Sequence, residues 1–149
     1  MYNALDMTSE PWQLDGTNYT AAAGTSDALT SDPITVDAEV IDILTMVGTV
    51  TTTGTVTIKI QQCDTSGGSY ADLEGTSQLV SASAMSNTLV HHRIIRPREG
   101  FLKVVCTRAT ANAVILSQCV IKRGLRKLPP STPTGSLVET HGSPAEGTA

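Results

Sequence analysis

Aromatic residues are nearly absent from this 149-residue chain, since Phe, Trp and Tyr together make up 3% of it. Sites that stack nucleic-acid bases or bind sugars usually need aromatic platforms, so this scarcity argues against both functions. No apolar run approaches the roughly 20 residues of a membrane-spanning helix. The first ten residues also lack the basic and apolar segments of a secretory signal. We therefore expect a protein made in the cytoplasm, with no membrane or nucleic-acid partner.

Motifs of common catalytic and cofactor sites are also missing. The chain has no Gly-x-Ser-x-Gly elbow, and Gly67 and Gly68 lack the Lys-Ser/Thr pair that follows in a phosphate-binding loop. Its three cysteines have no metal-ligand spacing, so we expect small, buried, free thiols at Cys63, Cys106 and Cys119. These absences predict a protein that is not an enzyme and that needs no cofactor and no metal.

Two groups of polar residues could suggest a metal site. His91 and His92 are adjacent, and adjacent side chains of a strand point to opposite faces. The pair therefore cannot bind one metal ion, and we expect one inward and one surface imidazole. Four early acids recur at near-regular spacing: Asp27, Asp32, Asp37 and Asp42. They lack the alternating carboxylates and central Gly of a calcium loop, so we expect them to form a solvated acidic face.

Charge is scarce, at 16% of residues, and unevenly distributed. Residues 1–90 carry eleven acids and one base, Lys59, whereas residues 91–149 carry nine bases and three acids. One interpretation is an acidic or basic surface that docks onto a partner. The other is that early and late strands interleave in one fold and neutralise each other. We favour the second, because a β-sandwich mixes strands from both halves.

The residues that are abundant predict strands. Thr, Ser, Val, Ala and Gly dominate, and β-branched residues favour extended backbone. In residues 54–62, Val56, Ile58 and Ile60 alternate with polar residues, as in a half-buried strand. Residues 39–51 also fit a helical face, but their content of Ile, Val and Thr favours a strand. Further strands are predicted at 79–83, 88–96, 101–108 and 113–123, with a short one at 17–23 and a turn at 64–69.

The arrangement of these strands predicts an all-β fold. Residues 109–112 are short enough to join the last two strands as a hairpin, and apolar residues on both faces of 113–121 indicate an interior strand. We expect a single β-sandwich or jelly-roll domain over residues 34–123. Residues 1–33 and 124–149 are predicted to be extended N- and C-terminal arms. The C-terminal arm holds four of the seven prolines and few apolar residues, so it cannot fold alone.

Three stretches carry a resemblance to a known family. In residues 55–72, TVTIKIQQCDTSGGSYAD, an alternating strand runs into a Gly-containing turn followed by an aromatic residue. Residues 100–105, GFLKVV, are similar to an Arg-Tyr-Val-Arg-Val strand. Residues 122–130 are a basic, proline-ended segment after the last apolar strand. Together, over about residues 36–130, these stretches resemble the small β proteins encoded among tailed-phage head genes, the capsid decoration or cement proteins.

The match within the first stretch can be followed residue by residue. Gln61, Asp64 and Tyr70 agree with the family pattern. Cys63 stands where Ser is usual, and Thr65 stands where a second Asp is usual.

The resemblance implies a virion structural protein that binds the outer surface of a tailed-phage capsid and bridges its capsomers. Its implied partners are the major capsid protein and neighbouring copies of itself, as a dimer or trimer. Its implied location is the capsid surface, after synthesis in the host cytoplasm. The alternative is a component of the phage tail, neck or fibre, with a structural or receptor-binding role.

A basic run near the end of the last strand is the most evident candidate contact. Four bases in six residues could bind phosphates, but the chain is acidic overall and poor in aromatics. A basic segment that grips an acidic protein surface is favoured instead. The predicted protein-contact residues are this run, the leucine after it and the sole Trp: Lys122, Arg123, Arg126, Lys127, Leu128 and Trp12.

Overall fold

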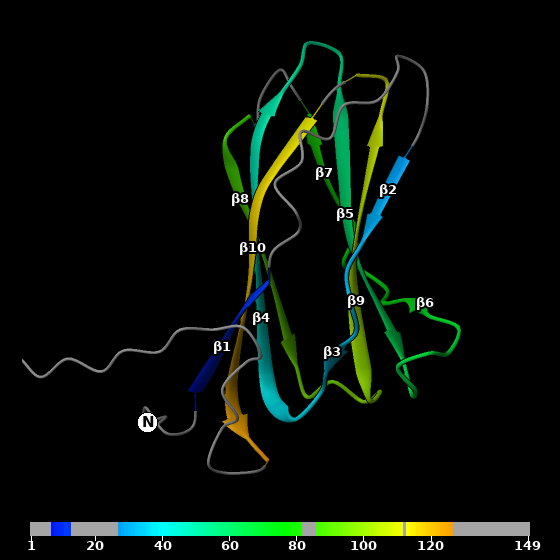
Figure 1. Ribbon diagram of the computed structural model, residues 1–149, viewed down its shortest axis with the longest axis vertical. Coiled ribbons are helices and arrows are strands. Elements are labelled where there is room, and N and C mark those ends of the chain that lie inside the picture. Colours follow the sequence, from blue (N-terminus) through cyan, green and yellow to red (C-terminus); the bar gives the residue numbers. More distant parts are fainter. Residues whose placement is uncertain (1–6, 13–26, 82–85, 112, 127–149) are drawn as a thin grey trace, which may run out of the picture.

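The computed structural model describes residues 7–12, 27–81, 86–111 and 113–126, where it forms two antiparallel β-sheets packed together (Figure 1). Sheet A has the order β1-β10-β4-β8, with β1 (Met7–Trp12), β10 (Ala113–Leu125), β4 (Ala38–Val50) and β8 (Thr88–Ile95). Sheet B contains β2 (Asp27–Thr30), β3 (Ile34–Thr35), β5 (Thr55–Cys63), β6 (Ala71–Asp72), β7 (Gln78–Ser81) and β9 (Phe101–Ala109). Within these ranges, no helix is long and apolar enough to cross a membrane. The predicted all-β sandwich is confirmed.

The chain alternates between the two sheets. From β4 in sheet A it passes to β5 and β7 in sheet B, returns to β8 in sheet A, and then runs through β9 in sheet B to β10 in sheet A. Apart from the two-residue strands β3 and β6, the orders β1-β10-β4-β8 and β2-β9-β5-β7 are those of an eight-stranded jelly roll, which is built from two Greek keys.

The predicted hairpin across residues 109–112 is wrong, because its two strands lie in different sheets. β9 pairs with β5 and β2, whereas β10 pairs with β1 and β4. A short gap suggested a hairpin, but packed sheets lie only about 10 Å apart, so a short connection also joins them. Thr110, with a φ of 72°, turns the chain there, and Thr53, with a φ of 75°, does the same between β4 and β5.

Alternate residues of the central strands fill the space between the sheets. Val56, Ile58 and Ile60 of β5 are buried, as the pattern of residues 54–62 predicts. β10 lies between β1 and β4, which confirms its predicted interior position. The core contains Ile34, Ala38, Ile41, Ile43, Val47, Val50, Val56, Ile58, Ile60, Val80, Val90, Ile94, Leu102, Val104, Cys106, Ala113, Ile115 and Val120.

β4 is the segment whose periodicity also fitted a helix. It is a strand because β10 and β8 bond it on its two sides. The four apolar residues that fitted a helical face, Val40, Ile43, Leu44 and Val47, are therefore divided between the two faces of the strand. Ile43 and Val47 are fully buried inside the sandwich, while Val40 and Leu44 are half-buried on the outer face of sheet A. This division gives sheet A an apolar surface on its outside as well as its inside.

The sandwich extends beyond residues 34–123 at both ends. β1 pairs with β10 and β2 pairs with β9, so two segments of the predicted N-terminal arm are strands of the sheets. Short edge strands acquire their hydrogen bonds from a neighbour and need little apolar sequence of their own. β10 continues to Leu125, passing Gly124 at a φ of 65°. The strand predicted at 17–23, and the arms at 1–6 and 127–149, lie outside the described residues.

Truncation in the core tests the inward pattern of β5. Ile58 is fully buried, so Ile58→Ala is expected to lower the free energy of unfolding by about 2–5 kcal/mol through lost burial and a residual cavity. Its neighbour Thr57 points to the outer face of sheet B, and Thr57→Ala is expected to cost less than about 1 kcal/mol. Urea denaturation of both variants measures the difference, and equal losses would contradict the assigned faces.

Candidate interaction surface on the outer face of sheet A

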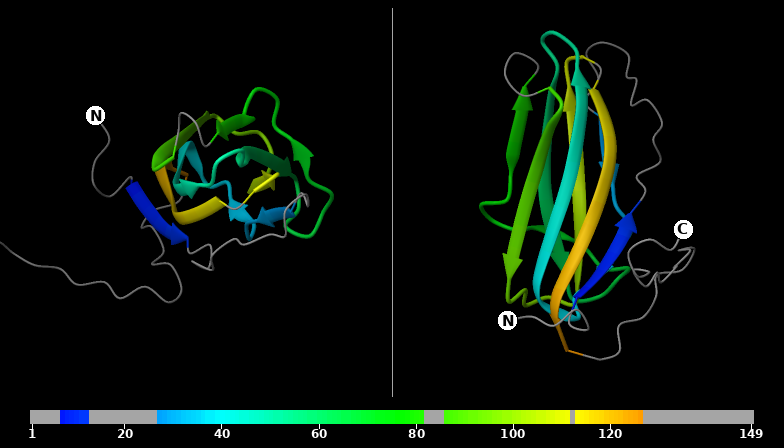
Figure 2. Two further views of the ribbon diagram at one scale, coloured as in Figure 1. Left: turned by 90° about the horizontal axis from the view of Figure 1, so that it is seen from above. Right: turned by 90° about the vertical axis from the view of Figure 1, so that its left-hand side faces the viewer.

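The outer faces of the two sheets differ in chemistry. On sheet B, the outward residues of β5 are polar: Thr55, Thr57, Lys59 and Gln61. On sheet A, β8, β4 and β10 lie side by side in the right-hand view of Figure 2, and no other described strand crosses in front of them. We call the outward apolar residues of these three strands the apolar face: Val40, Leu44, Met46, Leu89, Ile95, Leu116, Cys119 and Ile121.

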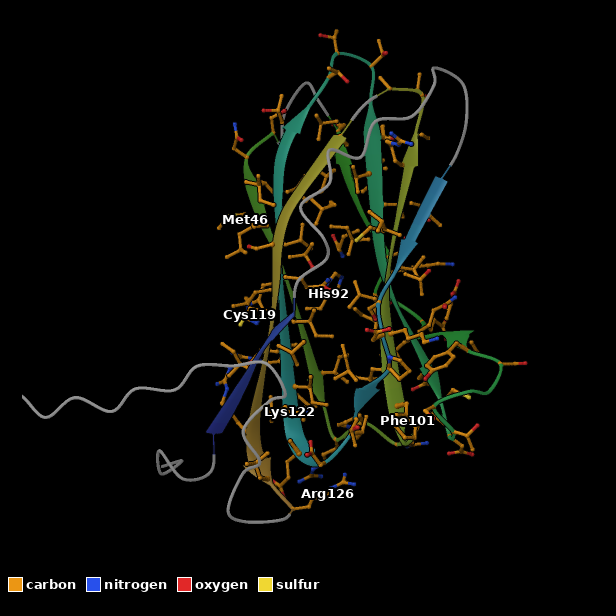
Figure 3. All side chains as sticks on the ribbon, in the orientation of Figure 1. Met46, His92, Phe101, Cys119, Lys122 and Arg126 are labelled. Atoms are coloured by element: carbon orange, nitrogen blue, oxygen red, sulfur yellow. The ribbon has the colours of Figure 1, made fainter. Side chains whose placement is uncertain are left out.

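The upper half of the apolar face consists of long aliphatic side chains. Met46 lies opposite Leu89 on β8, and both are exposed. Leu116 lies where β10 departs from regular pairing, and it packs over Gly48 of β4. A Cβ at Gly48 would lie 3.0 Å from Leu116 Cγ, so glycine permits this close approach. Figure 3 shows Met46 and Cys119 at the outer margin of sheet A, away from the space between the sheets.

A buried carboxylate lies within the apolar face. Asp42 points outward from β4, yet its side chain is only 1% exposed because bases from both neighbouring strands cover it. From β8, His91 Nε2 lies 2.8 Å and Arg93 Nε 2.6 Å from Asp42 Oδ1. From β10, Arg123 contacts Asp42 Oδ2. The predicted solvated acidic face is thus wrong at Asp42, since a carboxylate with this many donors can leave water.

The cluster of Asp42, Arg93, Arg123 and His91 carries an excess of positive charge. Two guanidinium groups share one carboxylate, and arginine keeps its charge at all ordinary pH values. The Arg93 side chain is 49% exposed and that of His91 is 41% exposed. The outer face of sheet A therefore combines exposed apolar side chains with a positive centre.

The pairing of early acids with late bases explains the uneven charge distribution. Asp42 meets Arg93 and Arg123, and Asp37 Oδ1 lies 3.1 Å from Lys122 Nζ. In each pair the acid comes from the first 90 residues and the base from the remainder. The favoured interpretation, in which the two halves neutralise each other within one fold, is confirmed for these pairs.

The residues of the predicted basic contact run point to opposite faces of sheet A, because neighbouring side chains of a strand alternate. Lys122 points inward from β10 and is 1% exposed, so its ammonium group pairs with Asp37 and is not on the surface. Arg123 points outward to Asp42, and Arg126 is exposed beyond the end of β10. Figure 3 shows Lys122 between the sheets and Arg126 at the lower end of the sandwich. Only the outward members of the run can meet a partner.

The other predicted contact residues are less completely placed. Trp12 is the last residue of β1 and stands opposite Gln118 of β10, but its side chain lies outside what the structure describes. Lys127 and Leu128 also lie outside the described residues. The structure adds Met46 and Leu89, which sequence reasoning missed. For Met46 the signal was the second apolar face of residues 39–51, which resembled a helix pattern, whereas Leu89 lies on β8, outside that segment.

The two adjacent histidines occupy opposite faces of sheet A, as predicted. His91 points outward to Asp42, whereas His92 is buried between the sheets, where Figure 3 labels it. His92 Nε2 lies 2.7 Å from the carbonyl oxygen of Thr76 and donates to it as a neutral imidazole. Burial lowers the pKa of His92, and charge on His91 lowers it further. His92 therefore links the sheets as a neutral group.

Cysteine chemistry contributes little to this surface. All three cysteines are free, and burial raises the pKa of Cys106 to about 12. Burial also raises the pKa of Cys119, which is half-buried within the apolar face. Both thiols are thus protonated at neutral pH, and a protonated thiol is a weak nucleophile. They act here as small apolar groups.

Replacing the central carboxylate tests how far the cluster stabilises sheet A. Asp42→Asn keeps the shape but leaves two arginines without their shared counter-charge, so we expect the free energy of unfolding to fall by about 1–3 kcal/mol. Asp72→Asn is the matched control, because Asp72 pairs with Lys59 on the exposed outer face of sheet B. The control should leave the urea midpoint almost unchanged. Equal midpoints for both variants would show that the cluster is not stabilising.

Acidification should destabilise the fold through His92. A histidine whose pKa is lower in the folded than in the unfolded chain binds fewer protons when folded, so stability falls as the pH drops below about 6.5. His92→Gln keeps a donor for the Thr76 carbonyl but does not titrate. We expect the thermal midpoint of the wild type to fall more than that of the variant between about pH 7.5 and about pH 5. If the two thermal midpoints fall in parallel with pH, the titration of His92 does not cause the loss of stability at acidic pH.

The outer face of sheet A gathers apolar and basic side chains. Among the described residues, no three His, Cys, Asp or Glu side chains are grouped so that they could hold a metal ion. The side chains that do gather are aliphatic groups around an arginine-rich centre, and Met and Arg are two of the residue types that protein interfaces enrich. The chain matches no family model and no curated protein.

Proposed function

We propose that the chain is a structural protein of a tailed-phage particle, which binds the outer surface of the capsid and stabilises it by bridging capsomers. The observation that carries the proposal is the apolar face of sheet A. Among the described residues, four of the five exposed large hydrophobics lie on it: Met46, Leu89, Ile95 and Leu116. The fifth, Leu79, is on the outer face of sheet B. Apolar groups gathered on one face are typical of interaction sites.

The build of the sandwich supports a mechanical role. β4 and β10 are each 13 residues long and pair along most of their length, and the contact between Asp42 and Arg123 joins them further. A rigid body presents its binding residues without ordering them at the moment of contact, so less affinity is lost on association. This is the property that a protein bridging neighbouring capsomers needs.

Two of the three stretches that carry the family resemblance, residues 55–72 and 100–105, meet in space, which also supports the proposal. β5 and β9 are paired, with Gln61 opposite Lys103. The ammonium group of Lys103 lies 4.3 Å from the ring centroid of Tyr70, and the Tyr70 hydroxyl donates to the Ser66 carbonyl oxygen at 3.1 Å. The strand, the turn and the aromatic residue of the resemblance thus form one local unit where β5 of sheet B ends.

The implied partners follow from this role. The major capsid protein would supply the surface that is bound, and neighbouring copies of this chain, as dimers or trimers, would extend the bridge. An oligomer binds a repeating shell through several contacts at once, and each further contact benefits from a high effective concentration. The protein would act at the capsid surface of the virion.

Copy number in purified particles tests the proposal. Quantitative mass spectrometry should give a ratio to the major capsid protein near one, or a simple fraction of one, because a decorating protein occupies every equivalent position of the shell. A handful of copies per particle would move the function to the tail, neck or fibre. Absence from particles would contradict the proposal.

A further inference from the structure

We infer that the apolar face of sheet A is the surface that meets the shell, and that the protein surface bound there is acidic. This inference rests on the proposed function and goes beyond it by naming the side of the sandwich that binds and the chemistry of its partner.

The size of the face suits a stable protein contact. At about 3.3 Å per residue and about 4.8 Å between strands, the three strands that carry the apolar face cover roughly 540 Å² in flat projection. A standard interface buries about 800 Å² of accessible surface on each partner, and side chains add to a flat projection. One partner seated on sheet A therefore has enough area for specific binding.

The composition of the face resembles the centre of an interface. Leu89 is 55% exposed and Ile95 is 66% exposed, and both lie on β8, on either side of the charged cluster along the strand. Arginine is one of the residue types that most often dominate the binding energy of an interface, where neighbouring contacts shield it from water. A phosphate backbone would set its charges against Leu89 and Ile95 as well as against Arg93. The face therefore suits a partner with apolar groups of its own, which favours protein over nucleic acid.

The charge of the face indicates which protein surface fits. Arg93 uses Nε to bind Asp42, so its two terminal Nη groups can serve another acceptor. Paired Nη groups match the geometry of a carboxylate. A second copy placed face to face would bring Arg93 and Arg123 against another positive cluster, which disfavours self-association through this face. A partner that offers Asp or Glu among apolar side chains complements it.

Particles that lack the chain provide the probe. Purified particles from a strain deleted for this gene would be incubated with the full-length protein, and the bound protein would be measured after sedimentation. The test variant is Leu89→Asp with Ile95→Asp, and its matched control is Leu79→Asp on the outer face of sheet B. The side chains of Leu79, Leu89 and Ile95 are each more than half exposed, so both variants should keep the fold. Measured thermal midpoints would verify this. We expect at least tenfold weaker binding for the test variant and wild-type binding for the control.

Charge reversal examines the nature of the partner. Arg93→Glu should weaken particle binding at least tenfold and more than Arg93→Gln does, because an acidic surface repels the new carboxylate. Lys59→Glu is the matched control, since Lys59 lies on the outer face of sheet B. It should bind like the wild type. Equal binding of Arg93→Glu and the wild type would exclude an acidic partner at this face.

The outcomes separate the inference from the proposed function. Wild-type protein that does not bind the particles would overturn both. Wild-type protein that binds, with the Leu89 and Ile95 variant binding equally well, would overturn the inference and leave the proposed function standing. If the wild type is an oligomer in analytical ultracentrifugation and the variant is a monomer that still binds particles normally, the face would be a contact between copies of the chain. That result would also overturn the inference.

Discussion

The burial of one face of each sheet against the other is the constraint on which the rest of this structure depends. Because strand side chains alternate, choosing which residues of β4 face inward also decides which face outward. Ile41 and Ile43 fill the core, and this directs Asp42 to the outside. A shift of one residue would bury the carboxylate in the core and expose both isoleucines. The same rule turns Lys122 inward and Arg123 outward on β10.

Asp42 also helps to specify the register of the strands, because its partners come from the strands on both sides of β4. Arg93 and His91 lie on β8 and Arg123 lies on β10, so the carboxylate is satisfied only when both neighbours keep their register with β4. A slip of two residues would keep the apolar alternation of the strands but separate the charges. Hydrophobic pattern thus selects the faces of the strands, and the charge cluster selects among the registers that this pattern allows.

Sequence reasoning succeeded where one local pattern decides the outcome. The alternation in residues 54–62 predicted β5, and the opposite directions of His91 and His92 followed from strand geometry alone. It failed where the outcome depends on a distant segment. Residues 109–112 carry no signal for a change of sheet, and β1 is a strand because β10 offers it hydrogen bonds. The Asp42 cluster joins residues about 50 and 80 positions apart, so spacing along the chain cannot reveal it.

The position of a charged cluster within an apolar surface has a consequence for selectivity. An apolar face alone would bind any apolar surface, including that of another copy of the chain. Arg93 and Arg123 alter this, because a partner that covers them without supplying negative charge must remove them from water uncompensated. In the proposed complex, binding strength would come from Met46, Leu89 and Ile95, while the arginines would impose a penalty on every partner of the wrong charge. Selectivity of this kind works by rejection, and it requires the charges to lie inside the apolar surface and not around its rim, where water would continue to solvate them.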